Sequence, residues 1–573
     1  MEDLHRSLLR RHLEAGHITR RDLIKRIGAI GASAPVVASL LAACGGSAST
    51  PTSSTSGSAP TATSGPVTIN ENATPSGQAA SPTAAALGKA GGSVTLIRGT
   101  DSNNLDMVEQ DGNVNIWILD SVYDQLIKMG PDGLSLVPGL AEKWSASSDG
   151  TTFTFNIRQG VKFSDGSDMK VSDITWSLNR AMTTKDSPWL FTLQQVKTIT
   201  APDNSTVVIT LSAPWAPFLA DVSMFNASIY SQAFSEKVGV ANLVSQTLGT
   251  GPFILKQWNK AQSMILTKNP NYWEQGLPLL DQITLNVVPD ANSRVLQLKG
   301  GQADGIIGQN DIALNQVADL QSNPNLQVTD WPSTYVNFVV MNCRNAPLDD
   351  IPTRQALNYA TDKDSIIKSV LFGHAAVSNS FMPNGALFWN KDQKGYPFDL
   401  TQAQNLMKQS KSPNGFDVEF QILGGNQLAL QLATAIKAMW SKINVNVNIS
   451  QLEQGVLHSN YVGNKFQLYL TGWTNDIIDP DELVSYAILP DASQAYHTGW
   501  SNQQAVDLAN QGRATLDPAK RQQIYYQIQQ IHMNDAPWVY LYVLPYIDAM
   551  NKKIKGYFHH PMGQWDFSKM STS

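Results

Sequence analysis

Cysteine is scarce in this chain, with only Cys44 and Cys343 among 573 residues. A disulfide framework or a cysteine-rich zinc site needs more cysteines, so both are excluded, and we expect neither a metal nor a cofactor. Clustered basic charge is missing too: 41 lysines and arginines stand against 47 acidic residues, a formal net charge of −6. Nucleic-acid binders usually carry a basic surface, so we expect no nucleic-acid partner.

Long hydrophobic runs are absent from most of the sequence. No run of 18 strongly apolar residues follows residue 50, which argues against a bundle of membrane-spanning helices. Hydrophobic residues still make up 42% of the chain and aromatic residues 8%, enough for sizeable cores. At about 150 residues per domain, the length predicts three or four domain-sized units of a large soluble protein.

Residues 1–43 are typical of an export signal. Basic groups are concentrated in residues 1–26, and a weakly apolar run follows from 27 to 43. This run contains a proline and is short for a membrane-spanning helix, which favours a secretory signal.

Two motifs indicate the route and the anchor. The segment around Arg20 and Arg21 resembles the twin-arginine export signal, and Leu41–Gly45 resembles a bacterial lipobox that ends in Cys44. The alternative to a lipoprotein signal is an ordinary membrane helix with an incidental cysteine. The alternative to the twin-arginine route is export by the general route. We expect cleavage before Cys44 and lipid anchoring through it on the outer face of the cytoplasmic membrane, where several acyl chains bind far better than one.

A tether follows the anchor over residues 44–91. Between residues 45 and 92, forty of 48 positions are Ser, Thr, Ala, Gly or Pro. Such a composition buries too little apolar surface to fold, so we expect a flexible or partly extended spacer. A folded body of about 480 residues is thus predicted to lie outside the membrane.

The first half of this body reads as strands, hairpins and two helices. The pattern predicts a strand at 92–97, a helix at 115–127 and a second helix capped by Ser172. Alternating apolar residues at 153–157 and 207–211 predict antiparallel hairpins.

The second half changes to alternating strands and helices. Strands are predicted at 418–423, 445–449 and 466–470, with a helix at 428–439 between the first two. Such β-α-β units predict an α/β fold with parallel strand pairs. Ligands of these sheets gather at the carboxyl ends of strands, where the loop beginning at Gly472 lies.

Enzyme motifs are weak. Ser167–Lys170 and Ser365–Lys368 match the S-x-x-K pattern of penicillin-recognising enzymes, but no S-D-N element accompanies them. The second match is expected on the solvated face of a helix. A serine hydrolase therefore stays a remote alternative, and Cys343 is interpreted as a small buried hydrophobic residue.

Several ordered stretches carry a family resemblance over residues 92–566. They are Val122–Leu126, Pro138–Trp144, Phe153–Gly166, Gly249–Phe253, Asn269–Trp273, Leu298–Asp304, Arg354–Asp362 and Gly472–Pro480. Because these stretches occur together and in this order, the folded body resembles the bacterial extracellular solute-binding proteins of family 5. This family includes the oligopeptide-, dipeptide- and nickel-binding receptors of ABC importers. The lipobox and tether agree with it independently.

The resemblance implies a periplasmic-binding-protein-like clamp with two lobes (type II, cluster C). Lobe I would comprise 92–130, 241–335 and 546–573, with an extra subdomain at 131–240, and lobe II would comprise 336–545. Such proteins close around a solute and present it to membrane permease subunits. We expect a monomeric receptor, not an enzyme.

The resemblance also implies site residues. Peptide-binding relatives place an Asp of a W-x-x-D pattern against the ligand's α-ammonium, and Trp473, Thr474 and Asp476 match that pattern. Capping of the following turn is the alternative role of Asp476. Tyr335 and Trp331 at the lobe crossing, and Trp500, complete the candidate ligand-binding set, with core packing as the alternative for the tryptophans.

One departure bears on the ligand. Dipeptide receptors of the family also use an Arg upstream of this Asp for the ligand's carboxylate, whereas no Arg lies between Asp399 and Asp476. This argues against strict dipeptide specificity. A peptide or oligopeptide is the expected ligand, and an oligosaccharide stacked on indoles is the alternative.

Overall fold

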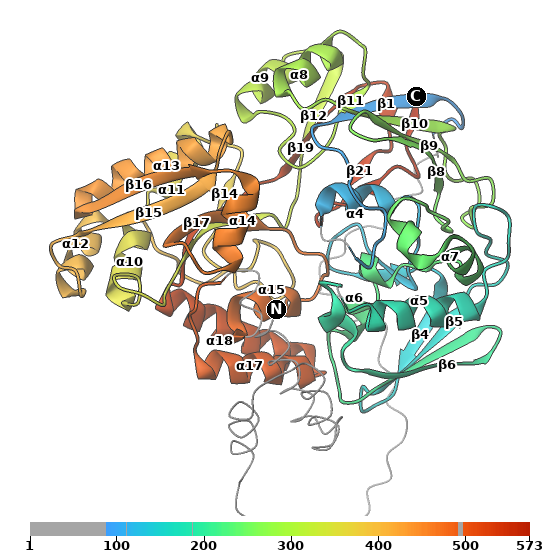
Figure 1. Ribbon diagram of the computed structural model, residues 1–573, viewed down its shortest axis with the longest axis horizontal. Helices are drawn as coiled ribbons and strands as arrows, with labels where there is room; N and C mark the ends of the chain where they lie inside the picture. Colours follow the sequence, from blue (N-terminus) through green and yellow to red (C-terminus); the bar gives the residue numbers. More distant parts are fainter. Residues whose placement is uncertain (1–87, 110–111, 186, 491–496, 573) are drawn as a thin grey trace, which may run out of the picture. The chain divides into compact units, whose positions relative to one another are not determined.

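The computed structural model describes residues 88–109, 112–185, 187–490 and 497–572. The predicted signal segment, Cys44 and nearly all of the predicted tether lie outside the described residues. Among the residues that are described, no helix is both long and apolar enough to cross a membrane. Figure 1 labels the helices and strands along the chain.

A seven-stranded mixed sheet forms the framework of what we continue to call lobe I. Its strand order is β12-β19-β11-β1-β10-β9-β8 (Figure 1). The central strand β1 is parallel to β10 and β11, and the outer pairs are antiparallel. The strands are β1 Ser93–Arg98, β8 Phe253–Asn259, β9 Ser263–Lys268, β10 Gln282–Val287, β11 Gly305–Ile306, β12 Leu326–Trp331 and β19 Tyr546–Asn551.

A six-stranded sheet forms the framework of lobe II. Its order is β14-β18-β13-β17-β15-β16, in which β15 is parallel to both β16 and β17, as the β-α-β pattern predicts. The strands are β13 Val336–Met341, β14 Ala376–Val377, β15 Phe416–Leu423, β16 Val445–Leu452, β17 Leu468–Trp473 and β18 Trp538–Val543. Every residue of β13 and β18 is buried, which fits their central positions.

The chain passes between the two sheets twice. Strand β12 leads into β13, and β18 leads into β19, so each connection joins one sheet to the other. The two connections are hydrogen-bonded to each other, because Leu544 N–H donates to the Tyr335 carbonyl at 3.1 Å and the Ser333 hydroxyl donates to the Leu544 carbonyl. Paired connections of this kind are where a hinge between lobes is built.

The hairpins form a third, antiparallel sheet in the order β4-β5-β7-β6. Its strands are β4 Ala141–Ala146, β5 Thr152–Ile157, β6 Val196–Asp203 and β7 Thr206–Leu211. Phe155 and Val207 from this sheet share one cluster of buried apolar side chains with Leu96 of β1. The third sheet therefore shares its core with lobe I.

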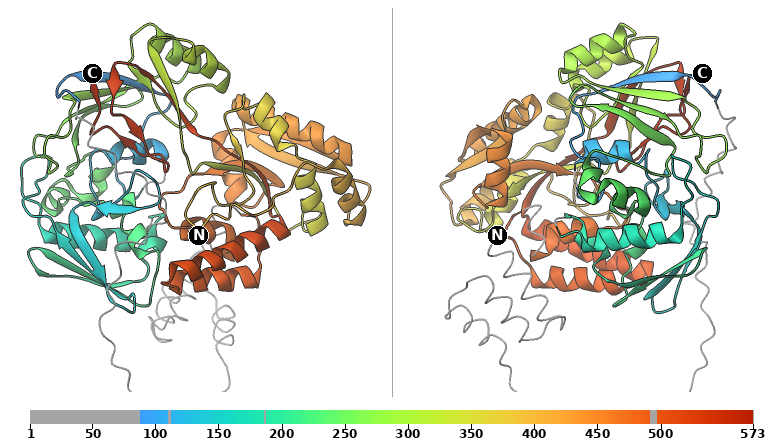
Figure 2. Two further views of the ribbon diagram at one scale, coloured as in Figure 1. Left: turned by 180° about the vertical axis from the view of Figure 1, so that it is seen from behind. Right: turned by 45° about the vertical axis from the view of Figure 1, so that its right-hand side comes forward.

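Helices cover the sheets, and Figure 2 shows them from two further sides. The long pair α17 and α18 pack against each other beside α15. The helices are α4 Asn113–Leu119, α5 Val171–Thr183, α6 Phe218–Asp221, α7 Gln232–Val238, α8 Ala291–Lys299, α9 Val317–Gln321, α10 Ile351–Tyr359, α11 Lys363–Ser369, α12 Leu400–Gln409, α13 Gln427–Trp440, α14 Gln454–Val462, α15 Asp481–Ile488, α17 Gln503–Ala514 and α18 Pro518–Asp535. Short paired strands are β2 Ile127–Met129 with β3 Leu136–Pro138, β20 Ile554–Lys555 with β23 Ser571–Thr572, and β21 Phe558–His559 with β22 Trp565–Asp566.

Two predicted helix boundaries are wrong. The helix expected at 115–127 ends at Leu119, because the backbone beyond it pairs with another segment: Gly251 and Phe253 N–H donate to the carbonyls of Val122 and Ser121. Tertiary pairing here overrides an apolar pattern that also suits a helix.

The second error concerns the start of α5. The helix is capped by Lys170 rather than Ser172, and Asp173 within its first turn accepts the Lys170 backbone N–H at 2.8 Å. An acidic side chain that reaches back from the first turn satisfies the backbone N–H of the cap residue itself, as in a capping box.

Candidate ligand-binding site

The loop that leaves β17 carries the predicted Asp476. It runs from Trp473 to the start of α15, at the carboxyl end of a strand parallel to β15. This is the edge at which ligands bind in such sheets. Asp476 is 4% exposed, so its carboxyl group is placed in a water-poor environment. A buried carboxylate requires hydrogen-bond or cationic partners.

Glu482 of α15 organises this loop. One of its carboxylate oxygens accepts the backbone N–H groups of Asp476 and Ile477, at 2.8 and 3.0 Å. The other accepts the Trp473 indole N–H at 3.0 Å. The N–H groups of the turn are thus bonded by Glu482, which was not among the predicted residues.

Lobe I holds the same loop from the other side. The Asn475 N–H donates to the Thr334 hydroxyl at 3.0 Å, and the hydroxyl groups of Tyr546 and Thr474 lie 3.4 Å apart. Thr334 lies in the connection from β12 to β13, and Tyr546 begins β19 directly after the other connection. The loop therefore contacts both sides of the chain crossing.

Apolar contacts reinforce this arrangement. Ile477 and Ile478 are buried in the large apolar cluster of lobe I, although they follow a strand of lobe II. Trp473, at the start of the loop, instead packs against a cluster of lobe II. One short segment thus carries Asp476 between side chains that are packed in opposite lobes.

A cavity of about 220 Å³ adjoins the loop on the side of lobe I. Its lining residues are Arg98, Thr100, Asn113, Val114, Trp117, Gly308, Gln309, Asp311 and Trp565. Many of them follow the carboxyl ends of the parallel strands β1 and β11 or begin α4. Gln309 Nε2 donates to the Thr474 hydroxyl at 3.3 Å, which links the cavity to the loop.

The charged groups of the cavity are largely used by the protein itself. Arg98 donates to the Val114 carbonyl at 2.8 Å and pairs with Asp101 at 2.8 Å, and burial lowers its pKa to about 10. Asp311 accepts the Gly99 N–H at 2.7 Å, and burial raises its pKa to about 6. The uncharged polar side chains of Asn113 and Gln309 also line the cavity.

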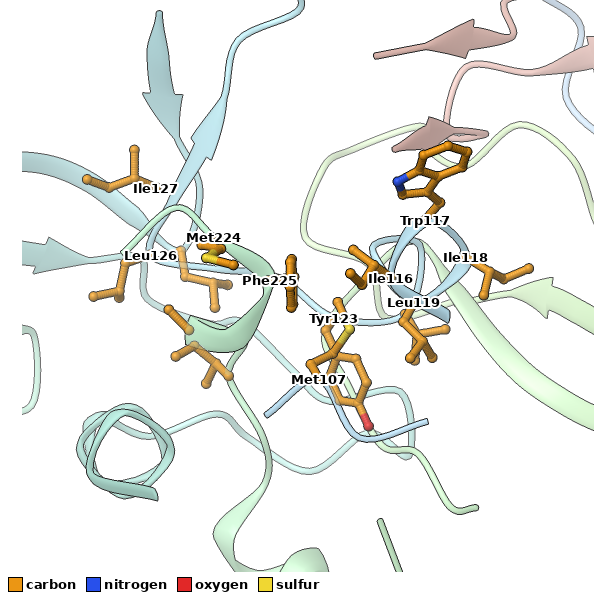
Figure 3. Packing of buried hydrophobic residues seen from close by; sticks show 14 of the residues in the cluster. Met107, Ile116, Trp117, Ile118, Leu119, Tyr123, Leu126, Ile127, Met224 and Phe225 are labelled. Carbon is orange, nitrogen blue, oxygen red and sulfur yellow. The ribbon is translucent and has the colours of Figure 1, made fainter. Parts of the chain in front are cut away.

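Aromatic side chains build the remaining wall. The Trp117 ring lies 5.7 Å from that of Trp565 and 5.4 Å from that of His559, each in edge-to-face geometry. In Figure 3, Trp117 points from α4 toward the pale red strands, away from Leu119 and Tyr123. Rigid aromatic walls with a few polar groups are typical of small-molecule sites.

The predicted Tyr335 lies beside the loop, whereas the two other predicted tryptophans lie elsewhere. The Tyr335 ring packs against Gly472, and its hydroxyl is hydrogen-bonded to Asn310 of lobe I. Trp331 packs edge-to-face on Phe558, at 5.4 Å. Trp500 donates its indole N–H to Asp535 at 3.0 Å. These last two contacts belong to the packing of their own lobes.

The cavity residues could not be found from the sequence because they come from segments far apart in the chain. Arg98 ends β1 and Gln309 follows β11, and nothing in the sequence shows that those strands are parallel neighbours. The sequence indicates Glu482 only weakly: it is an acidic residue in the first turn of a helix, where negative charge is favoured by the helix dipole.

The S-x-x-K matches do not form a nucleophile site. The Ser167 hydroxyl donates to Asp165 at 2.6 Å in an exposed turn. Ser365 lies in the first turn of α11, where its hydroxyl donates to the capping Asp362 at 2.6 Å. Both serines serve turn and cap geometry.

Comparison with known proteins identifies the family. Residues 135–494 match the bacterial extracellular solute-binding proteins, family 5 Middle. The chain belongs to this family. Its two-lobed periplasmic-binding-protein fold is thereby confirmed, as is its place among the extracellular solute-binding proteins that serve ABC transporters.

Relatives extend over most of the chain. The dipeptide-binding protein of Escherichia coli is 29% identical over 483 residues, which cover 78% of this chain and 89% of the relative. Heme-binding protein A of Haemophilus influenzae is 28% identical over 478 residues, 79% of this chain and 87% of the relative. Both relatives are named as binding proteins.

A solved structure shows the same fold. The periplasmic binding protein DppA from Helicobacter pylori, in complex with the peptide STSA, superposes with a TM-score of 0.75 at 26% identity. The superposition covers 84% of this chain and 98% of the other.

Proposed function

We propose that this protein captures an oligopeptide with a free amino terminus between its two lobes and delivers it to an ABC permease. The observation that carries the proposal is the position of Asp476: a buried carboxyl group at a strand end, on a loop that both lobes hold. The family and the peptide complex of a relative support this proposal.

The proposed site binds a ligand without catalysing a reaction. A peptide α-ammonium brings one positive charge and three donors, which satisfy a carboxylate that closure withdraws from water. A neutral sugar brings only hydroxyl groups. Asp476 therefore favours a ligand whose cationic end lies against the β17 loop.

No arginine lies between Asp399 and Asp476 to bind the ligand's carboxylate. Arg98 in lobe I is already bonded to Asp101 and the Val114 carbonyl. We infer that neither Arg98 nor an arginine between residues 399 and 476 binds the ligand's carboxylate, which suits peptides longer than two residues.

A thermal-shift panel tests this function. We expect tri- to pentapeptides with free amino termini to raise the melting temperature of the mature protein, because a ligand that binds only the folded state stabilises it. Nickel–histidine, heme and cello- or xylo-oligosaccharides serve as the other arms. Stabilisation by an oligosaccharide alone would show that the ligand is a sugar and not a peptide. Hydrolysis of a chromogenic ester, measured separately, would support the alternative of a serine hydrolase.

We further propose that the mature protein is a monomer anchored through lipid on Cys44 and exported by the twin-arginine route. Two or more acyl chains hold a protein on a membrane stably, whereas a soluble exported chain partitions into the medium or periplasm. The lipobox at 41–45 and the paired Arg20 and Arg21 support this proposal.

Cys44→Ser is expected to move the protein from the membrane fraction to the soluble exported fraction, because the acylated atom is removed. Immunoblotting of the two fractions measures the change, with Cys343→Ser as the matched control, which should stay on the membrane. Full membrane retention of Cys44→Ser would contradict lipid anchoring. Lysines in place of Arg20 and Arg21 should block export separately.

A further inference from the structure

Glu482 is a buried carboxylate whose bonds all point into the loop of the proposed ligand site. It is 1% exposed and accepts three N–H groups, from the Trp473 indole and from the backbones of Asp476 and Ile477. Charge-assisted bonds of this kind are short and strong. They hold the loop at its first residue and in its middle.

The far end of the loop is held separately. Asp479 forms a two-pronged ion pair with Arg521 of α18, at 2.7 and 2.9 Å. Between these fixed points lies Asp476, whose backbone position is set directly by Glu482. The backbone at Asp476 is therefore held by Glu482 together with the packing of Ile477 and Ile478.

The carboxyl group of Glu482 also interacts with that of Asp476. Its side chain is hydrogen-bonded to Asp476 as well, so two carboxyl groups share one buried loop. Burial raises the pKa of Glu482 to about 7, and the donated N–H groups oppose that rise. A hydrogen bond between two carboxyl groups needs one of them protonated, and the bond from Asp476 lowers the pKa of Glu482. A cation placed beside the pair would favour the ionised form of both groups.

We propose that Glu482 is a positioning residue that sets the loop so that Asp476 faces a cationic ligand group, and that it thereby determines the preference for a ligand with a free amine. The proposal rests on the proposed function of Asp476. A neutral ligand gains nothing from the second carboxylate, so the effect of Glu482 falls on ligands that carry an ammonium group.

Glu482→Gln tests this assignment with little change in volume. A carboxamide has one acceptor oxygen, so it can serve either the Trp473 indole or the two backbone N–H groups, and its NH₂ group then opposes the other donors. We expect affinity for a free-amine tetrapeptide to fall roughly 10- to 100-fold, the range of lost charge-assisted hydrogen bonds. Affinity for the N-acetylated tetrapeptide should change about 3-fold or less, by calorimetry.

Glu453→Gln is the matched control. Glu453 also accepts two backbone N–H groups, those of Gly455 and Val456, but at the exposed start of α14. It should leave both affinities unchanged. A second variant, Trp473→Phe, removes one donor to Glu482 and should produce a smaller loss of the same selective kind, which keeps the test valid if Glu482→Gln folds poorly. The Trp473 indole N–H resonance, assigned by its loss in Trp473→Phe, should shift in Glu482→Gln.

The outcomes separate the two proposals. A wild-type protein that binds free and acetylated peptides equally overturns both. A wild type that discriminates, with Glu482→Gln keeping its affinities and its selectivity, overturns the role of Glu482 alone. Equal losses for free and acetylated peptides would mark Glu482 as a packing residue and likewise overturn the proposal.

Discussion

Asp476→Asn is expected to weaken binding of a free-amine peptide by roughly 30-fold or more while sparing its N-acetylated form. Removing one partner of a buried charge pair typically costs about 2–5 kcal/mol, since the other charge stays desolvated. The asparagine keeps the size of the side chain, loses the charge and replaces one acceptor oxygen by an NH₂ donor. Calorimetric titration of both peptides against the variant measures the effect.

Asp362→Asn supplies the matched control for this prediction. Asp362 caps α11 in lobe II and accepts the Ser365 N–H at 2.9 Å, a role that asparagine fills equally well. It should bind both peptides as the wild type does. If Asp476→Asn weakens the free and the acetylated peptide alike, Asp476 shapes the loop and is not an ammonium site.

Arg521→Met is expected to destabilise lobe II by about 3–5 kcal/mol, because the charge of Asp479 would then remain buried without its partner. Arg521 is 5% exposed and Asp479 4%, and the guanidinium also donates to the Gly512 carbonyl at 2.9 Å. The pair thus joins α17, α18 and the end of the Asp476 loop. The free energy of unfolding by denaturant, followed by fluorescence, measures the loss.

The double variant with Asp479→Asn distinguishes the pair from general packing. Because both charges are then removed, its loss should be smaller than the sum of the two single losses. Asp168→Asn is the control, since the Lys162–Asp168 pair is largely exposed and contributes little. Strict additivity of Arg521→Met and Asp479→Asn would contradict a coupled ion pair.

Strands could be predicted where apolar and polar residues alternate in the sequence, because alternate residues of a strand face the core. Phe153, Phe155 and Ile157 are all buried in β5 while their neighbours are not. The helix expected at 115–127 failed because its apolar residues also suit the irregular segment that pairs with Gly251 and Phe253. Such pairing between distant segments has no local signal.

The candidate site divides in the same way. Trp473, Thr474 and Asp476 were predicted because they match the W-x-x-D pattern that the family resemblance implies, at the end of a recognisable strand. The cavity around Trp117, Gln309 and Trp565 was not, since its residues meet only once the parallel strands of lobe I are assembled. Trp331 and Trp500 were predicted as ligand-binding residues, but their indoles make packing contacts within their own lobes. The sequence alone does not distinguish these two roles of a tryptophan near a loop.

Calorimetric titration of the wild-type mature protein tests the central claim most directly. A tetrapeptide with a free amino terminus, its N-acetylated form and a cello-oligosaccharide are titrated under one set of conditions. We predict that the free peptide binds at least roughly 30-fold more tightly than the acetylated one, and that the sugar does not bind. Equal affinity for the two peptides, or tight binding of the sugar, would contradict capture of a peptide through its α-ammonium group.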